Sequence, residues 1–203
     1  MTINILAPEH HNLDNTARLT KGIPIPRDIM SNGVVAPSAE QLYYMARVLP
    51  ESMHRNALAL ARVAIAAAVD GVEAKGLAHR MGDPDLGIPM IIDMPTKRAI
   101  MLDCVRAKFA QDDGLALELM NTNGEIAELN NWGDSDWGKI LNEDGEWDGE
   151  NYTGEILMLV RGEVRARYDA ERNRFFGSEE DRQRTVESYV RSAFSFVESH
   201  SGN

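Results

Sequence analysis

The residues best suited to chemistry in this 203-residue chain are concentrated in one acidic segment, residues 125–150. The segment holds nine carboxylates, one base (Lys139) and three tryptophans, and it carries −8 of the formal net charge of −11. Carboxylates can transfer protons or stabilise a developing positive charge, and an indole ring can stack on a base. Tryptophans are costly to expose and long loops are usually functional, although these indoles could simply anchor the segment to the core. The nine acidic residues are Glu125, Glu128, Asp134, Asp136, Glu143, Asp144, Glu146, Asp148 and Glu150.

Metal binding does not fit the spacing of these residues. A calcium loop needs a glycine at its sixth position and a bidentate Glu at its twelfth. Counting from Asp134 places Lys139 sixth and Gly145 twelfth, so the acidic segment lacks that pattern. The adjacent His10 and His11 converge poorly on one metal ion. No glycine-rich phosphate loop occurs either, and we therefore expect neither a metal nor a cofactor.

Composition sets limits on the class of protein. With 43% hydrophobic and 26% charged residues, the chain is typical of a globular domain. A net charge of −11 argues against coating nucleic acid through a basic face. The single Cys104 excludes an intrachain disulfide, and the most apolar stretch (57–69) is too short to cross a bilayer. The N-terminus also lacks the pattern of a secretory signal. We expect a cytoplasmic protein without membrane contact, and no pattern sets an oligomeric state.

The elements that must position these residues are mostly helical. Ser38 and Gln41 form a capping box, which predicts a helix to about Leu49. A second helix is expected from Pro50 to Val69, and its Ala and Leu content predicts that it is well buried. Two later helices are marked by apolar stripes. One begins at Asp93 and Pro95 and has the stripe Ile100, Cys104, Val105 and Phe109; the other begins at Asn151 or Thr153 and has the stripe Ile156, Leu157, Val160 and Val164. The other expected elements are a helix over 71–81, a loop over 82–94, a short helix over 115–120, a strand over 125–129, a loop over 130–150 and a last helix over 178–198.

The expected fold class is therefore mainly α, a single compact helical domain with a few short β-strands. We expect residues 1–169 to form the domain. Residues 170–203 are expected to form a C-terminal helical extension, either packed on the domain or trailing it.

Motif order adds information that composition lacks. Residues 134–138 read Asp-Ser-Asp-Trp-Gly, and residues 149–161 read Gly-Glu-Asn-Tyr-Thr-Gly-Glu-Ile-Leu-Met-Leu-Val-Arg. This pair resembles the signature of the NADAR family, an acid-x-x-Trp-Gly element before Gly-x-Asn-x-x-Gly-x-Leu-Leu-Met-x-x-Arg. Four other segments resemble family elements more weakly and occur in the same order along the chain. Residues 13–15 resemble Leu-Ser-Asn-Phe, and the expected helix over 38–47 resembles Glu-His-Tyr-Phe-Gln-Ala-Gln-Lys. Residues 78–82 resemble a small-x-x-Met-Gly turn, and residues 101–109 resemble a helix that ends in Arg-Ala-Lys-Phe. The resemblance covers roughly residues 12–168.

The resemblance implies a mostly α-helical domain that cleaves an N-glycosidic bond to a phosphorylated ribose. One branch of the family resembles hydrolases of reactive riboflavin-pathway intermediates, and another removes ADP-ribose from guanine bases, including those in DNA. By position, Glu40, Asp134 and Trp137 match the family's active-site residues. The chemistry suits them, because a carboxylate can stabilise the cationic sugar while a second carboxyl transfers a proton. Trp137 could stack on the base or exclude water.

Five further residues are expected to bind substrate: Asn15, Gly138, Asn151, Lys108 and Arg161. Four of them have a simpler interpretation. Gly138 could serve backbone geometry alone, Asn151 could only cap a helix, and Lys108 or Arg161 could pair with acids instead of phosphate. The same holds for Glu40, which suits the first turn of a helix, and for Asp134, which could only fix a turn.

Two departures from the family pattern bear on the substrate. Residues 91–94 lack the aromatic residue found there in the family, and Arg47 replaces a helix-ending lysine, although arginine is a poor nucleophile. The leading hypothesis is removal of ADP-ribose from a guanine base, with only transient contact with modified DNA. The alternatives are a hydrolase of phosphorylated riboflavin-pathway intermediates, a non-catalytic ADP-ribose or NAD binder, and an acidic decoy for a nucleic-acid-binding partner.

Overall fold

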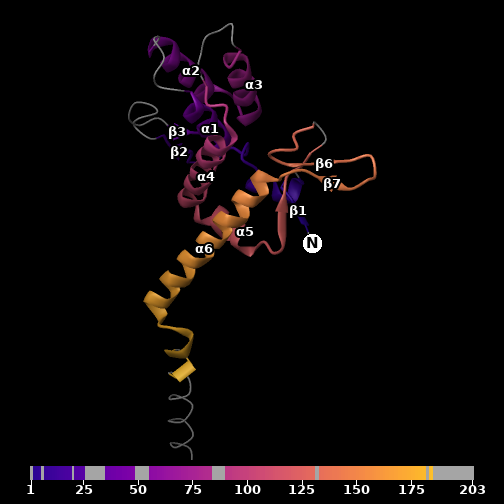
Figure 1. Cartoon of the computed structure of the whole chain (residues 1–203). Coiled ribbons are helices and arrows are strands. Elements are labelled where there is room, and N and C mark those ends of the chain that lie inside the picture. Colours follow the sequence, from indigo (N-terminus) through magenta and orange to yellow (C-terminus); the bar gives the residue numbers. More distant parts are fainter. Residues whose placement is uncertain are drawn as a thin grey trace, which may run out of the picture. The chain divides into compact units, whose positions relative to one another are not determined.

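The structure is a computed structural model that describes residues 2–5, 7–19, 21–25, 35–48, 55–83, 90–130, 133–181 and 183–184. Contacts within the chain separate it into two compact units, residues 1–162 and residues 163–203. The described residues form these helices: η1 (Pro8–Leu13), α1 (Ala39–Arg47), α2 (Arg55–Ala67), α3 (Gly71–Met81), α4 (Met94–Gln111), α5 (Asp113–Asn121) and α6 (Tyr152–Phe176). The mainly helical fold with a few short strands is confirmed (Figure 1).

Side-chain caps explain where three of these helices begin. Ser38 Oγ accepts a hydrogen bond from the backbone N–H of Gln41, which starts α1 as the capping box predicts. Asp93 accepts a hydrogen bond from the N–H of Thr96 and starts α4, with Pro95 in the first turn. Asp70 caps α3 in the same way. The helix predicted over 71–81 matches α3 residue for residue.

The strands are short, and one of their pairings joins residues that are distant in sequence. β1 (Thr2–Asn4) runs parallel to β4 (Glu125–Ala127), and Ile3 pairs with Ile126. β2 (Ile23–Pro24) pairs with β3 (Val35–Ala36) just before α1. A third sheet has the order β5 (Leu129–Asn130), β6 (Lys139–Leu141) and β7 (Trp147–Asp148). β1 therefore anchors the strand that leads into the acidic segment.

The core of residues 1–162 surrounds α1. This helix packs against α2, α3 and α4, and seven of its nine residues are buried. From α4, the predicted stripe positions Cys104, Val105 and Phe109 are buried, as is Met101. From α6, the predicted stripe positions Ile156, Leu157 and Val160 are buried as well. Because α1 is covered on several sides, polar side chains on it are held in an apolar setting.

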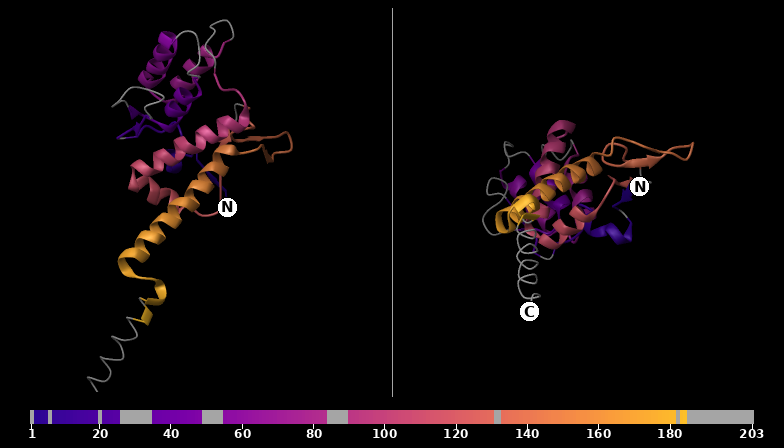
Figure 2. Two further views of the ribbon diagram at one scale, coloured as in Figure 1. Left: turned by 60° about the vertical axis from the view of Figure 1, so that its left-hand side comes forward. Right: turned by 90° about the horizontal axis from the view of Figure 1, so that it is seen from below.

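Two predictions about the elements were wrong. In α2, Leu60 and Val63 are 69% and 49% exposed, because only the face with Ala61 and Ile65 meets the rest of the fold. The segment over 130–150 is not one long loop, because residues 139–148 fold back as the β6–β7 hairpin. Figure 2 shows this hairpin extending away from α1–α4.

Some predictions fall partly outside the described residues. They are the start of the second helix before residue 55, most of the loop over 82–94, and the last helix beyond residue 184. In residues 163–203, the start of that last helix is described: Ser178 Oγ accepts from the N–H of Asp181 at 3.1 Å. The boundary predicted after residue 169 stays a prediction. No helix in the described part of the chain combines the length and apolar character needed to cross a membrane.

Candidate active site

One cavity of about 640 Å³ lies within residues 1–162, a volume in the range of small-molecule sites. Its walls come from the segment after η1, from α1, α3 and α4, from the acidic segment and from the start of α6. The chain thus brings together groups up to 139 positions apart. The lining residues are Asp14, Asn15, Thr16, Glu40, Tyr43, Tyr44, Arg47, Val72, Lys75, His79, Met94, Lys97, Met101, Glu128, Asp134, Asp136, Trp137 and Thr153.

Glu40 lies in the first turn of α1 and is only 8% exposed. Its backbone N–H donates to the carbonyl of Asn15 at 2.9 Å, which ties α1 to the N-terminal segment. Burial raises the pKa of the Glu40 carboxyl from 4.5 to about 8, with Lys75 opposing that rise. Tyr44, one turn along α1, forms a hydrogen bond with this carboxyl. Glu40 is therefore mostly protonated at neutral pH and can donate a proton.

A glycine lets a neighbouring helix approach Glu40 closely. A Cβ on Gly71, the first residue of α3, would lie 2.8 Å from Thr16 Cα and 3.0 Å from Glu40 Cβ. The first distance is shorter than Cβ atoms show against backbone, and the second would force Glu40 to shift, so glycine suits the start of α3 here. The close packing brings Lys75, one turn further along α3, into the same cavity as Glu40.

Asp134 is held by a turn of the acidic segment. Its Oδ1 accepts from the backbone N–H of Trp137 at 3.1 Å, and its carbonyl accepts from Asn130 Nδ2 at 2.9 Å. Its Oδ2 lies 3.9 Å from Lys75 Nζ. Asp134 therefore both fixes the turn through its hydrogen bonds and lines the cavity.

The same turn caps α6, which explains the spacing of the two motif halves. Carbonyls of residues 135–138 accept from the backbone N–H groups of residues 150–153, at 2.7 to 3.3 Å. These donors lie at the start of α6, where helical partners are missing. The cap fixes the Trp137 ring, which meets Tyr43 at 5.6 Å and Tyr152 at 6.2 Å between centroids. Trp137 thus forms an aromatic wall of the cavity.

Asn15 is the predicted substrate-binding residue that does line the cavity. It is 5% exposed, and its Nδ2 lies 3.6 Å from Met101 Sδ. In the described part of the chain, its Oδ1 has no hydrogen-bond partner. A buried acceptor without a donor is unfavourable. A ligand hydroxyl or amine in the cavity would satisfy it.

Lys108 and Arg161 do not line the cavity. Lys108 is fully buried on α4, and its Nζ donates to the carbonyls of Asn12 and Asp14, each at 2.7 Å. Arg161 on α6 donates to Thr122 Oγ1 at 3.1 Å and to the carbonyl of Gly124 at 2.9 Å. Both cations bind backbone carbonyls, where the sequence predicts phosphate or carboxylate partners.

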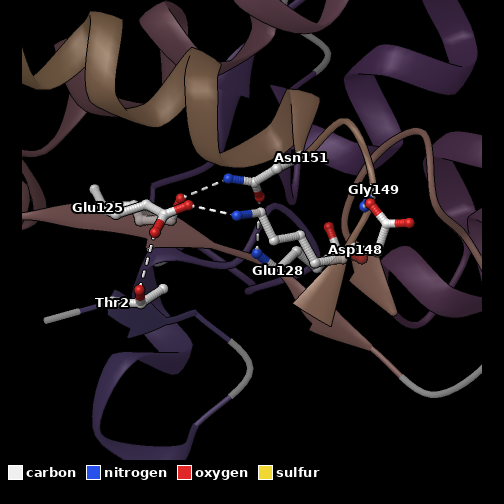
Figure 3. Close-up of polar contacts among 8 residues, drawn as sticks. Thr2, Glu125, Glu128, Asp148, Gly149 and Asn151 are labelled. Carbon is white, nitrogen blue, oxygen red and sulfur yellow. Dashed lines mark hydrogen bonds and ion pairs between the residues drawn. The ribbon is translucent and has the colours of Figure 1, made fainter. Parts of the chain in front are cut away.

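Gly138 and Asn151 also serve the backbone. A Cβ on Gly138 would collide with the carbonyl of Glu128. Asn151 has a φ of 58° and does not cap α6 with its side chain. Instead its Nδ2 donates to the carbonyl of Ile126 at 2.9 Å, and its Oδ1 accepts from the N–H of Glu128 at 3.3 Å (Figure 3). These two residues join the start of α6 to the end of β4.

Glu128 is a functional candidate that sequence reasoning missed. It follows β4, is half-buried, and lines the cavity with Glu40. Burial raises the pKa of its carboxyl from 4.5 to about 7, while a hydrogen bond with Thr153 opposes this. Its position in the sequence could have indicated this role, because Glu128 is the acidic residue directly after the apolar pair Ile126 and Ala127, which is buried.

The remaining acids of the segment lie away from the cavity. Of the nine, only Glu128, Asp134 and Asp136 line it. Glu125 pairs with Lys139 at 2.6 Å and also accepts from Thr2 Oγ1 (Figure 3). The acids on the β6–β7 hairpin are exposed. Trp147 is 45% exposed on the hairpin, and Trp132 lies outside the described residues. Most of the acidic segment is thus solvated and does not take part in the site.

Basic side chains in the cavity were missed as well. Arg47, Lys75, His79 and Lys97 line it, although none of the four is predicted from the sequence to bind substrate. Within the described ranges, no group of three or more His, Cys, Asp or Glu is placed to hold a metal ion.

The fold and cavity define a class: a mainly helical domain that presents carboxyl groups and aromatic rings to a ligand. The chain belongs to the NADAR family, whose model, the NADAR domain, matches residues 19–165. This family includes N-glycosidase activity. The NMR structure of the E. coli protein YbiA is similar in fold, with a TM-score of 0.57 and 20% identity over 83% of this chain and 86% of YbiA. No curated protein sequence matches the chain.

Proposed function

We propose that this protein is an N-glycosidase that hydrolyses a ribose–nitrogen bond, with ADP-ribosylated guanine as its substrate. The observation that carries the proposal is that Glu40, Asp134 and Trp137 line one cavity although 94 positions separate Glu40 from Asp134. An acid, a carboxylate and an aromatic wall are the groups that this reaction needs.

The proposed steps follow from the protonation of each group. Glu40, with a pKa of about 8, donates its proton to the leaving nitrogen as the bond to ribose breaks. The Asp134 carboxylate, held by the Trp137 N–H, stabilises the positive charge that develops on the sugar. Glu128, with a pKa of about 7, accepts a proton from the water that adds to the sugar carbon. The products are free ADP-ribose and unmodified guanine.

The charge distribution supports a small modified nucleotide over a long nucleic acid. The exposed acids of the β6–β7 hairpin repel a phosphate backbone, so extended contact with DNA is disfavoured. A cavity of about 640 Å³ can take a single nucleotide-sized group. We propose only transient contact with modified DNA, as the base and the ribose bonded to it enter the cavity.

The test is release of ADP-ribose from DNA that carries ADP-ribosylated guanine. Wild-type protein is compared with Glu40→Gln, Asp134→Asn and the control Asp148→Asn, which removes one charge from an exposed residue of the same segment. We expect release by the wild type and by the control, and a loss of about hundredfold or more in the two cavity variants. No release, or full release by both cavity variants, would overturn the proposal.

Two further arms separate the alternatives. Phosphorylated riboflavin-pathway intermediates are offered under the same conditions, and turnover of these alone would move the substrate to the flavin branch. Calorimetry with ADP-ribose then identifies a binder. Tight binding without turnover of any N-glycoside would make the protein a non-catalytic ADP-ribose module.

A further inference from the structure

We propose that the tip of the β6–β7 hairpin is a docking surface for a basic segment of another protein. The hairpin tip comprises residues 141–148, all of which the structure describes. It carries an exposed apolar pair, Leu141 and Trp147, together with acidic residues that the proposed reaction does not use. No residue of the hairpin tip lines the cavity, so this inference goes beyond the proposed function and does not depend on it.

Leu141 and Trp147 form one apolar patch. They are direct partners in the antiparallel pairing of β6 with β7, and the side chains of direct partners lie on the same face of a sheet. Leu141 is 55% exposed and Trp147 is 45% exposed, and the hairpin that carries them extends away from α1–α4 (Figure 2). Tryptophan is enriched among the residues that dominate binding energy at protein interfaces, so Trp147 is the expected anchor.

The charge of the hairpin tip defines the partner. The tip has no basic residue and four acidic ones, all exposed: Glu143, Asp144, Glu146 and Asp148. Each lies within three positions of Leu141 or Trp147 along the chain, which limits the Cα separation to about 11 Å. Screening in physiological salt acts over about 8–10 Å, so these carboxylates influence a group that contacts the apolar pair. In the described part of the chain none of the four forms an ion pair, which leaves their charge for a partner.

A basic peptide segment that also carries an apolar side chain fits this surface. Its Lys or Arg residues would pair with the acidic residues, and its apolar side chain would cover Trp147. A phosphate backbone or an anionic membrane has the wrong charge. A second copy of the chain, packed through the same face, would place like carboxylates opposite each other, because a twofold contact joins identical surfaces. The occupant that we propose is therefore a different protein.

Hydrogen bonds fix the turn of the hairpin tip before any partner binds. Asn142 Oδ1 accepts from the backbone N–H of Asp144 at 3.1 Å and from that of Glu146 at 2.8 Å. The N–H of Asn142 donates to the carbonyl of Glu146 at 2.8 Å, and Gly145 has a φ of 81°, which glycine adopts without strain. Because the two strands are held together in this way, binding would order little additional chain.

The first test selects short peptides that bind the full chain from a phage-displayed random library. We expect the enriched peptides to have a net positive charge and to contain an aromatic or large aliphatic residue. Enrichment without an excess of Lys and Arg over the unselected library would overturn the proposal, and so would a selection that enriches no peptide.

The most enriched peptide, labelled with a fluorophore, is then the probe for variants. Trp147→Ser removes the anchor, and the triple variant Glu143→Gln, Asp144→Asn, Glu146→Gln removes three charges. We expect each of these two proteins to bind the probe about tenfold more weakly or worse. The control is Leu159→Ser, which changes an apolar residue of α6 that is 50% exposed, and its affinity should stay within about twofold of the wild type.

Wild-type affinity in a folded Trp147→Ser or in the triple variant would contradict the docking surface. Thermal melting checks folding, and the triple variant carries the test if Trp147→Ser unfolds. Sedimentation of the free chain examines the second-copy alternative, because a dimer that Trp147→Ser dissociates would assign this face to self-association and refute the proposal. ADP-ribose release by these variants should equal that of the wild type, so the outcome here is separate from the outcome for the proposed function.

Discussion

The backbone N–H of Trp137 donates a 3.1 Å hydrogen bond to Asp134 Oδ1, so one proposed active-site residue holds the other. The second oxygen, Oδ2, lies 3.9 Å from Lys75 Nζ and faces the cavity. Asp134 therefore has two roles that substitution can separate, a structural one through Oδ1 and an electrostatic one through its charge.

Asp134→Asn keeps the acceptor and removes the charge. We expect its melting temperature to stay within about 2 °C of the wild type, while ADP-ribose release falls about hundredfold. Asp134→Ala loses the turn hydrogen bond as well, and should also lose about 1 kcal/mol of stability. Calorimetric melting and the release assay measure both. Equal activity in Asp134→Asn and wild type would show that the charge is not needed.

The pKa values of Glu40 and Glu128 predict a narrow pH profile. Glu40 must be protonated to act as an acid, so activity should fall above pH about 8. Glu128 must be ionised to act as a base, so activity should fall below pH about 7. The profile of kcat/KM should therefore have its maximum between these values. In Glu128→Gln the acidic limb should disappear and the rate should fall about hundredfold. An unchanged limb would assign the titration to another group.

Tyr44→Phe should move the alkaline limb in a known direction. The hydrogen bond with Tyr44 lowers the pKa of Glu40, so its loss should raise that pKa and shift the limb to higher pH. The measurement is the same profile on the variant. A shift of the alkaline limb to lower pH would contradict the role of Tyr44. An unchanged alkaline limb would show that it does not report the titration of Glu40.

Glu40 also predicts a pH dependence of stability. Because its pKa is raised from 4.5 to about 8 on folding, the folded chain keeps a proton that the unfolded chain releases between these values. This contribution is fully present below pH 4.5 and is lost as pH rises through 8. Glu40→Gln stays uncharged, so at pH 9 it should melt about 10 °C above the wild type although it is inactive. A lower melting temperature at pH 9 would contradict the burial of Glu40.

Lys108→Met tests whether this lysine is structural. Its ammonium donates to the carbonyls of Asn12 and Asp14, so the substitution leaves two acceptors without a donor. We expect a loss of about 2 kcal/mol or more in the free energy of unfolding, and an unchanged KM in the folded fraction. Arg106→Met on the same helix is the control and should lose about 0.5 kcal/mol or less. If Lys108→Met had normal stability and a raised KM, the phosphate-binding role predicted from the sequence would be supported instead.

Local patterns predicted the parts of the fold that depend on local interactions. The caps Ser38 and Asp93 mark where α1 and α4 begin, because a cap acts within three residues. The pairing of β1 with β4 could not be predicted, since it joins Thr2 to Glu125 through two short strands. The β6–β7 hairpin was missed because its turn residues and acids resemble an ordinary polar loop.

The candidate site was predictable only where a motif marked it. Glu40, Asp134, Trp137 and Asn15 were named from motif positions, and the structure brings them to one cavity. Lys75, Lys97 and His79 carry no motif, and only the packing of α1, α3 and α4 makes them neighbours. Lys108 shows the opposite case, because its motif position is matched while its side chain points to backbone carbonyls.

The most direct test of the central claim is the amount of free ADP-ribose released in a single turnover from DNA with ADP-ribosylated guanine. Wild-type protein in excess should release ADP-ribose stoichiometrically and leave unmodified guanine in the DNA. Glu40→Gln should bind the same DNA and release about a hundredth or less in the same time. Stoichiometric release by Glu40→Gln, or none by the wild type, would contradict the account.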